Sequence, residues 1–210
     1  MVIDVWSDVV CPWCFIGWTR LSQAIAASPH AQQISVRHRA FQLQSEIRDV
    51  VPTAELLASK YGTTPEKIAQ MQAHVCEIAT GEGLNYQLSG SFSGNTEDAH
   101  RLLIWAAGVG KQEELLTAMF SAYFEHSMPL FSHQDLLAIT DGVGLDRDEA
   151  LAVLNSRLFL EEVQDDARTA ASLGASGVPF FVLDNRWGIS GAQSQEVFAQ
   201  ALEEAWAGQK

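Results

Sequence analysis

The sequence predicts an α/β fold in which a β-α-β unit and a β-β-α unit are separated by a large, all-helical insertion. Strand-like patterns lie near the two ends of the chain, at residues 2–6, 34–41 and 178–190. The stretch from about residue 53 to about residue 173 instead carries a series of helix-start signals. A Cys-Pro-Trp-Cys motif at residues 11–14 directly follows the first strand and opens the first helix.

The N-terminal half of the α/β fold begins with Val-Ile-Asp-Val-Trp at residues 2–6, an apolar run typical of a short strand. Pro12 suits the first position of the next helix, because its fixed φ matches a helix and its missing N–H has no partner there. We expect this helix to continue through Leu21 and Ala24. Residues 34–41 then alternate apolar and polar side chains, which indicates a half-buried strand.

The middle of the chain is predicted to be a helical domain. Thr53 caps a short helix that ends at Tyr61, and Thr64 with Pro65 opens a longer helix that ends near Gly81. Further helices are expected at 95–108, 111–126, 132–140, 146–156 and 159–173.

Strand character returns at residues 178–183 and 187–190, separated by a turn centred on Asn185. Ser194 then caps an amphipathic helix that reaches Ala205. We therefore divide the chain into an α/β domain, residues 1–52 plus 174–210, and an inserted helical domain, residues 53–173.

Composition narrows the classes of partner. The formal net charge of −13 argues against nucleic acid or an anionic membrane, since both require a basic face. No apolar run approaches the roughly 20 residues that span a bilayer. The N-terminus also lacks a basic stretch followed by an apolar segment. We expect a cytoplasmic protein.

The spacing of Cys11 and Cys14 suits a dithiol that opens and closes. Residues three apart share one helix face, so the two sulfurs can reach bonding distance. Cys11 would lie at the helix N-terminus, where unpaired N–H groups and the helix dipole stabilise a thiolate. We expect Cys11 to be the exposed thiol and Cys14 the buried one.

Metal binding is the main alternative for a Cys-x-x-Cys motif. The chain has three cysteines and six histidines, and only Cys76 and His74 are plausible additional ligands. A single pair without a second pair is weak support for zinc or an iron–sulfur cluster, so no metal is expected. Cys76 falls on the apolar face of a predicted helix, which favours a buried, inert thiol.

The order of elements and three sequence blocks resemble the thioredoxin fold with a helical insertion, as in the DsbA family. The similarity is greatest to the FrnE-like branch, which also resembles 2-hydroxychromene-2-carboxylate isomerases and kappa-class glutathione transferases. The blocks that carry this resemblance are residues 4–17, residues 95–102, and residues 177–181 with 190–193.

The resemblance implies a cis Val178–Pro179 bond that faces the dithiol. The backbone of Val178 beside Cys11 could then pair with an extended substrate segment. Trp13, between the two cysteines, is expected to contact substrate together with Pro12.

Relatives of this fold carry a buried acid below the dithiol that relays a proton. Asp4 is the candidate for this role here, and Asp8 is a rival because the spacing from Asp4 to Cys11 is one residue longer than in those relatives. His100 is expected to pack near the site from a capped helix.

These observations favour a DsbA-like protein disulfide oxidoreductase or isomerase, in which Cys11 attacks and Cys14 resolves the mixed disulfide. Its partners would be protein or small-molecule thiols and disulfides. No cofactor is expected, glutathione is a candidate redox partner, and a homodimer stays open. The alternatives are a glutathione-dependent isomerase or transferase, or a peptide-binding chaperone that uses a groove near Trp13 and Pro179. Which way electrons flow is not set by the residues.

Overall fold

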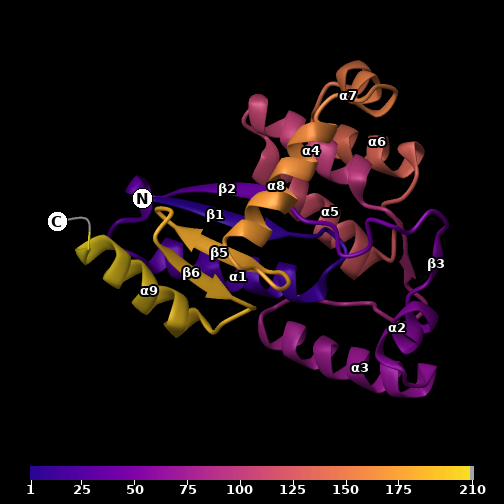
Figure 1. Cartoon of the computed structure of the whole chain (residues 1–210), viewed down its shortest axis with the longest axis horizontal. Coiled ribbons are helices and arrows are strands. Elements are labelled where there is room, and N and C mark those ends of the chain that lie inside the picture. The colour runs from indigo at the N-terminus through magenta and orange to yellow at the C-terminus, as the bar shows by residue number, and fades with distance from the viewer. Residues whose placement is uncertain (209–210) are drawn as a thin grey trace. The chain divides into compact units, whose positions relative to one another are not determined.

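The computed structural model describes residues 1–208 of the chain. It separates into two compact units, coloured by residue number in Figure 1. The first unit joins Met1–Leu43 with the residues from Val163 onward, and the second unit is Gln44–Glu162. The first unit carries the Cys-x-x-Cys motif, so it positions the candidate site.

The first unit is built on a four-stranded sheet in the order β2-β1-β5-β6. Strand β1 (Val2–Ser7) is parallel to β2 (Ser35–Ala40) and antiparallel to β5 (Phe180–Leu183). Strand β6 (Trp187–Ser190) is antiparallel to β5. The sheet therefore joins the two ends of the chain, and the predicted β-α-β and β-β-α order is confirmed.

Helices cover the faces of this sheet (Figure 1). Helices α1 (Pro12–Ala27) and α9 (Gln195–Ala207) pack against each other, and the ring of Phe181 meets that of Phe198 on α9 with centroids 4.8 Å apart. On the opposite face Phe180 and Val182 pack with Ala170 of α8 (Leu160–Ser172). Alternate residues of β5 thus face different helices, as the period of a strand requires. A short 3₁₀ helix, η1 (Ala31–Gln33), precedes β2.

The second unit is helical, which confirms the predicted insertion. Two short strands, β3 (Val51–Pro52) and β4 (Phe92–Ser93), also pair there in antiparallel fashion. These strands were not predicted, because a ladder of two residues leaves no periodic pattern in the sequence. The helices are α2 (Thr53–Tyr61), α3 (Pro65–Gly81), α4 (Glu97–Gly108), α5 (Gln112–His126), α6 (His133–Gly142) and α7 (Arg147–Leu154).

The unit boundaries differ from the predicted division at residues 52/53 and 173/174. The reason at the second boundary is Asp166 on α8, whose carboxylate accepts a hydrogen bond from the Ala40 N–H at 2.9 Å. The indole N–H of Trp6 also donates to the Asp166 carbonyl at 2.8 Å. Most of α8 therefore belongs to the sheet unit, and not to the insertion. At the first boundary, Val51 and Pro52 pair with β4 inside the helical unit.

One buried cation organises the second unit. The side chain of Arg101 on α4 is only 4% exposed and forms an ion pair with Asp98 at 2.6 Å. Its guanidinium also donates to the Leu158 and Ser156 carbonyls at 2.8 Å, and to the Val153 carbonyl. Arg101 thus binds the carbonyls at the C-terminal end of α7 and in the loop after it, where helical partners have run out.

Candidate functional site: a dithiol at a helix N-terminus

Cys11 and Cys14 occupy the first turn of α1. Cys11 is the N-cap residue with an extended backbone, and Pro12 is the first helical residue, as predicted. The Cys14 N–H donates to the Cys11 carbonyl at 2.9 Å, and the Cys11 N–H donates to the Asp8 carbonyl at 3.0 Å. Both cysteines are free thiols. The loop from Asp8 and the start of α1 together hold the dithiol at the end of β1.

The two thiols differ in environment, although both are buried. Cys11 is 5% exposed and Cys14 is 1% exposed, so the expectation that Cys11 is the exposed thiol is wrong. Burial raises the pKa of Cys14 well above its ordinary value, and a hydrogen bond with the Cys11 side chain raises it further. The negative charge of Asp8 acts in the same direction, whereas a hydrogen bond with the Asp8 backbone opposes it. Cys14 is therefore held as a neutral thiol.

The Val178–Pro179 bond is cis, as the resemblance implied. The Cys11 thiol donates to the Val178 carbonyl, with Sγ and O 3.7 Å apart. Pro179 is buried and Val178 is partly exposed. The first unit thus brings together Cys11, Cys14, Val178 and Pro179 from opposite ends of the sequence.

Trp13 lies between the two cysteines and is 37% exposed. Pro12 beside it is partly exposed. An exposed indole next to a reactive pair supplies apolar contact area that a substrate could cover. A substrate-binding role for Trp13 and Pro12 stays a prediction.

Asp4 and Asp8 are both buried, at 3% and 0% exposure. The Asp4 carboxylate accepts hydrogen bonds from Arg37 at 2.7 Å and Arg39 at 2.8 Å. Asp8 instead accepts the Leu43 N–H at 2.7 Å and raises the pKa of Cys14 through its charge. The structure thus places the Asp8 charge near Cys14, whereas the Asp4 carboxylate pairs with two arginines of β2. A proton-relay role for either carboxylate stays a prediction.

The residues considered as extra metal ligands lie on α3 in the second unit. His74 faces Glu77 at 3.6 Å. Cys76 is partly exposed, so the expectation of a buried thiol is wrong. Within residues 1–208, no group of three or more His, Cys, Asp and Glu side chains could hold a metal ion. His100 is 2% exposed on α4 of the same unit.

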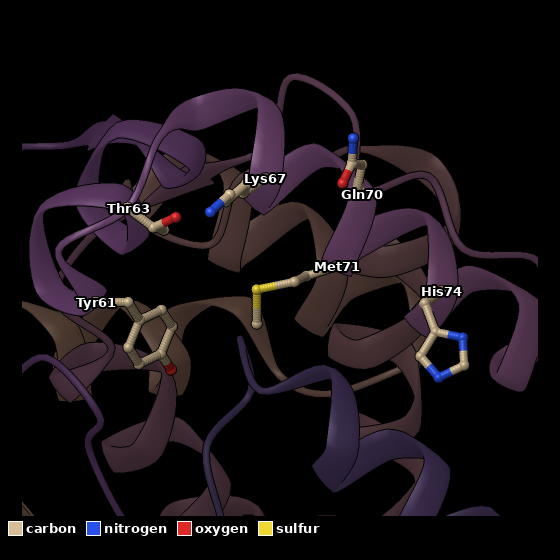
Figure 2. A pocket seen from close by; sticks show the side chains of 6 residues that line it. All are labelled: Tyr61, Thr63, Lys67, Gln70, Met71 and His74. Carbon is tan, nitrogen blue, oxygen red and sulfur yellow. The ribbon is translucent and has the colours of Figure 1, made fainter.

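A separate cavity of about 530 Å³ lies between α2 and α3 (Figure 2). Figure 2 shows the Met71 sulfur near the middle of this cavity, with Tyr61 and Lys67 beside it. The Met71 side chain is exposed, at 55%. The residues that line the cavity are Tyr61, Thr63, Lys67, Gln70, Met71 and His74.

None of the helices that the structure describes is both long and apolar enough to cross a membrane.

The first unit has a mixed sheet in the order β2-β1-β5-β6, and a helix with two cysteines at its N-terminus follows the first strand. This is the architecture of thioredoxin-like proteins. The DSBA-like thioredoxin domain family matches residues 2–203, and the chain therefore belongs to this family.

Three solved structures illustrate the likeness. A probable DsbA oxidoreductase from Streptomyces coelicolor is 41% identical, with a TM-score of 0.95 over 99% of this chain and 90% of the other. A 2-hydroxychromene-2-carboxylate isomerase is 16% identical, with a TM-score of 0.72 over 97% and 95%. The cytosolic disulfide reductase DsbM from Pseudomonas aeruginosa, solved with glutathione, is 18% identical, with a TM-score of 0.71 over 99% and 100%. The last two likenesses concern the fold alone, and this set of neighbours is consistent with the FrnE-like branch.

Proposed function

We propose that this protein is a thiol–disulfide oxidoreductase that exchanges disulfides through Cys11 and Cys14. The observation that carries the proposal is the asymmetry of the pair. Cys11 opens α1 beside the Val178 carbonyl at 3.7 Å, whereas burial raises the pKa of Cys14. Cys11 is thus the thiol that reacts first, and Cys14 stays protonated until the second step.

In the first step the Cys11 thiolate attacks one sulfur of a substrate disulfide. A bond forms between Cys11 and that sulfur, the substrate S–S bond breaks, and the other substrate sulfur leaves as a thiolate that takes up a proton. Cys11 lies at the N-terminus of α1, beside the Val178 carbonyl. The raised pKa of Cys14 keeps this second thiol protonated meanwhile.

In the second step Cys14 loses its proton and attacks the Cys11 sulfur. A Cys11–Cys14 disulfide forms, and the second substrate sulfur leaves as a thiol. The substrate has then gained two electrons and the pair has lost two. The same steps in reverse oxidise a substrate dithiol, so the direction depends on the potential of the pair relative to its surroundings.

Glutathione is the redox partner that we propose, in a cytoplasmic setting. It would reduce the Cys11–Cys14 disulfide by two successive exchanges and leave as glutathione disulfide. The fold shared with DsbM, which was solved with glutathione, supports this choice.

A glutathione-dependent isomerase is the second candidate, and the shared fold of the isomerase structure supports it. The resemblance to these isomerases implies a serine at the position where this chain has Cys11. The presence of both cysteines favours redox exchange. The Cys11→Ser variant distinguishes redox exchange from isomerase activity and from a chaperone role.

Substituting Cys11→Ser is expected to abolish disulfide reduction and dithiol oxidation, because the attacking sulfur is gone. Cys14→Ser should instead accumulate a mixed disulfide on Cys11, which mass spectrometry of the intact protein detects. Cys76→Ser is the matched control, since Cys76 lies on α3 of the other unit. Full exchange activity in the Cys11→Ser variant would contradict the proposal. Isomerase turnover or holdase activity that survives this substitution, in a protein without exchange activity, would favour the isomerase or the chaperone.

A further inference from the structure

Gly17 is a buried residue in the second turn of α1. A glycine inside a helix is destabilising relative to alanine, because the unfolded chain loses more freedom. Its φ is not in the left-handed region that favours glycine. A reason for glycine here must therefore come from the space around it.

The space beside Gly17 is filled by the residue before β5, by β5 itself and by the turn after β6. A Cβ on Gly17 would lie 3.0 Å from Cγ of Pro179, 3.2 Å from Cζ of Phe181 and 3.4 Å from Cα of Ala192. The first two distances are tighter than ordinary van der Waals contact. The missing side chain thus lets Pro179 and the turn containing Ala192 rest on the backbone of α1.

Two hydrogen bonds stabilise the contact between α1, Pro179 and the turn that contains Ala192. The Gly191 N–H donates to the Pro179 carbonyl at 2.8 Å. The guanidinium of Arg20, one turn after Gly17 on α1, donates to the Ala192 carbonyl at 2.8 Å. Gly191 itself has φ +79, a backbone conformation that L side chains rarely adopt.

A continuous path therefore runs from α1 to the site. It leads from Gly17 and Arg20 through the turn at residues 190–193 to Pro179, and the adjacent Val178 carbonyl lies 3.7 Å from the Cys11 sulfur. Cys11 is at the start of the same helix. The separation between the attacking sulfur and the Val178 backbone is thus set by how closely Pro179 approaches Gly17.

We propose that Gly17 and Arg20 are positioning residues that hold the Val178 backbone at the distance from Cys11 needed to dock an extended peptide. This inference rests on the proposed disulfide exchange and adds a preference for peptide over small disulfides. An extended peptide would use backbone hydrogen bonds at Val178, whereas a small disulfide needs only the Cys11 sulfur. A shift of Pro179 should therefore affect the two kinds of substrate differently.

The test compares Gly17→Ala with wild type on a peptide that contains one disulfide and on oxidised dithiothreitol. A misplacement of about 1 Å can cost about 100-fold in rate, and this Cβ requires a shift of only a few tenths of an ångström. We expect kcat/KM for the peptide to fall about tenfold, mainly through KM. The rate with oxidised dithiothreitol should stay within about twofold of wild type, because no backbone docking is involved.

Gly108→Ala is the matched control, because Gly108 ends α4 and a Cβ there meets nothing within 4 Å. It should leave both rates unchanged. Arg20→Gln removes the hydrogen bond to Ala192 without adding bulk, and it should shift selectivity between the two substrates in the same direction. This variant provides the test if Gly17→Ala fails to fold. Arg20→Lys, which keeps a donor, should restore part of the peptide rate.

Equal losses on both substrates, or no loss in folded Gly17→Ala or Arg20→Gln protein, would overturn the positioning role while leaving the proposed function intact. A wild-type protein that exchanges neither substrate would instead overturn the proposed function and this inference with it.

Discussion

At the scale of single residues, the site depends on two sulfurs with unlike surroundings. Cys11 ends a loop and starts a helix, whereas Cys14 lies one turn further and is 1% exposed. The charge of Asp8 adds to the effect of burial on the pKa of Cys14. Burial is the larger cause, and both effects favour the protonated form of Cys14.

Substituting Asp8→Asn should lower the pKa of Cys14 toward its ordinary value, because a nearby negative charge that disfavours the thiolate is removed. Burial, the largest cause of the raised pKa, would remain. The ultraviolet absorbance of the thiolate, followed against pH in a Cys11→Ser background, measures this pKa.

Asp4→Asn is the control for this substitution, since Asp4 pairs with Arg37 and Arg39 instead. Asp4→Asn should leave the pKa of Cys14 unchanged. A larger shift from Asp4→Asn than from Asp8→Asn would restore Asp4 as the acid that serves the dithiol.

His38 on β2 makes stability depend on pH. Burial lowers its pKa from 6.5 to about 4, and its ring meets Trp18 edge-on with centroids 4.7 Å apart. The unfolded chain binds a proton at His38 below about pH 6.5, while the folded chain binds it only below about pH 4. Stability is therefore unaffected above pH 6.5 and is lost as the pH falls from 6.5 to 4, by a total of about 3 kcal/mol.

Urea unfolding of wild type and His38→Gln across this pH window measures the contribution. The difference in unfolding free energy between the two proteins should change by about 3 kcal/mol, in the sense that wild type loses more stability at the acid end. Parallel pH curves for the two proteins would contradict this assignment.

At the scale of secondary structure, capping explains many of the helix boundaries. Thr64, Ser132, Asp146 and Ser194 each accept a backbone N–H from their own first turn, and such residues are recognisable in sequence. The predicted hairpin turn is also confirmed, since Asp184 and Asn185 adopt φ of 47 and 54. Local chemistry of this kind is visible in the sequence because the interacting groups are two or three residues apart.

Arg101 is the clearest case of an interaction between elements that the sequence did not reveal. Its partners at Val153, Ser156 and Leu158 lie more than fifty residues away, so only the fold brings them together. Arg101→Met should lower the unfolding free energy by about 3 kcal/mol, because the partly exposed Asp98 carboxylate and several backbone carbonyls lose their buried donor. Chemical denaturation measures this loss.

Arg147→Met is the comparison, because Arg147 is 55% exposed and pairs with the exposed Asp141. Its effect should stay below about 1 kcal/mol, as for other surface ion pairs. Similar losses from the two substitutions would show that Arg101 does not organise the second unit.

At the scale of the whole molecule, strand and helix order was predictable, while the division into units was not. The order follows from local patterns and from the motif at Cys11. The boundary at Glu162 depends instead on Asp166, whose contacts with Ala40 and Trp6 cross more than a hundred residues. The arginine partners of Asp4 were not predictable for the same reason, because strand parity alone does not reveal which carboxylate meets an arginine.

In the candidate site, too, some features could be predicted from the sequence and others could not. Cys11, Cys14, Val178 and Pro179 were predicted from their motifs, and the structure brings them together. The burial of Cys11 and the close packing around Gly17 were not predicted, since both depend on how closely separate parts of the first unit approach each other. A sequence reveals the residue types of a motif and their spacing, but it does not reveal how tightly other parts of the fold pack around them.

The most direct test of the central claim is to equilibrate the protein with glutathione buffers of graded potential and to analyse the trapped thiols by mass spectrometry. We expect a reversible two-electron transition in which a Cys11–Cys14 disulfide forms and Cys76 stays reduced. Cys14→Ser should stop at a mixed disulfide with glutathione on Cys11. A pair that stays reduced across the whole range, or that forms its disulfide through Cys76, would contradict the account.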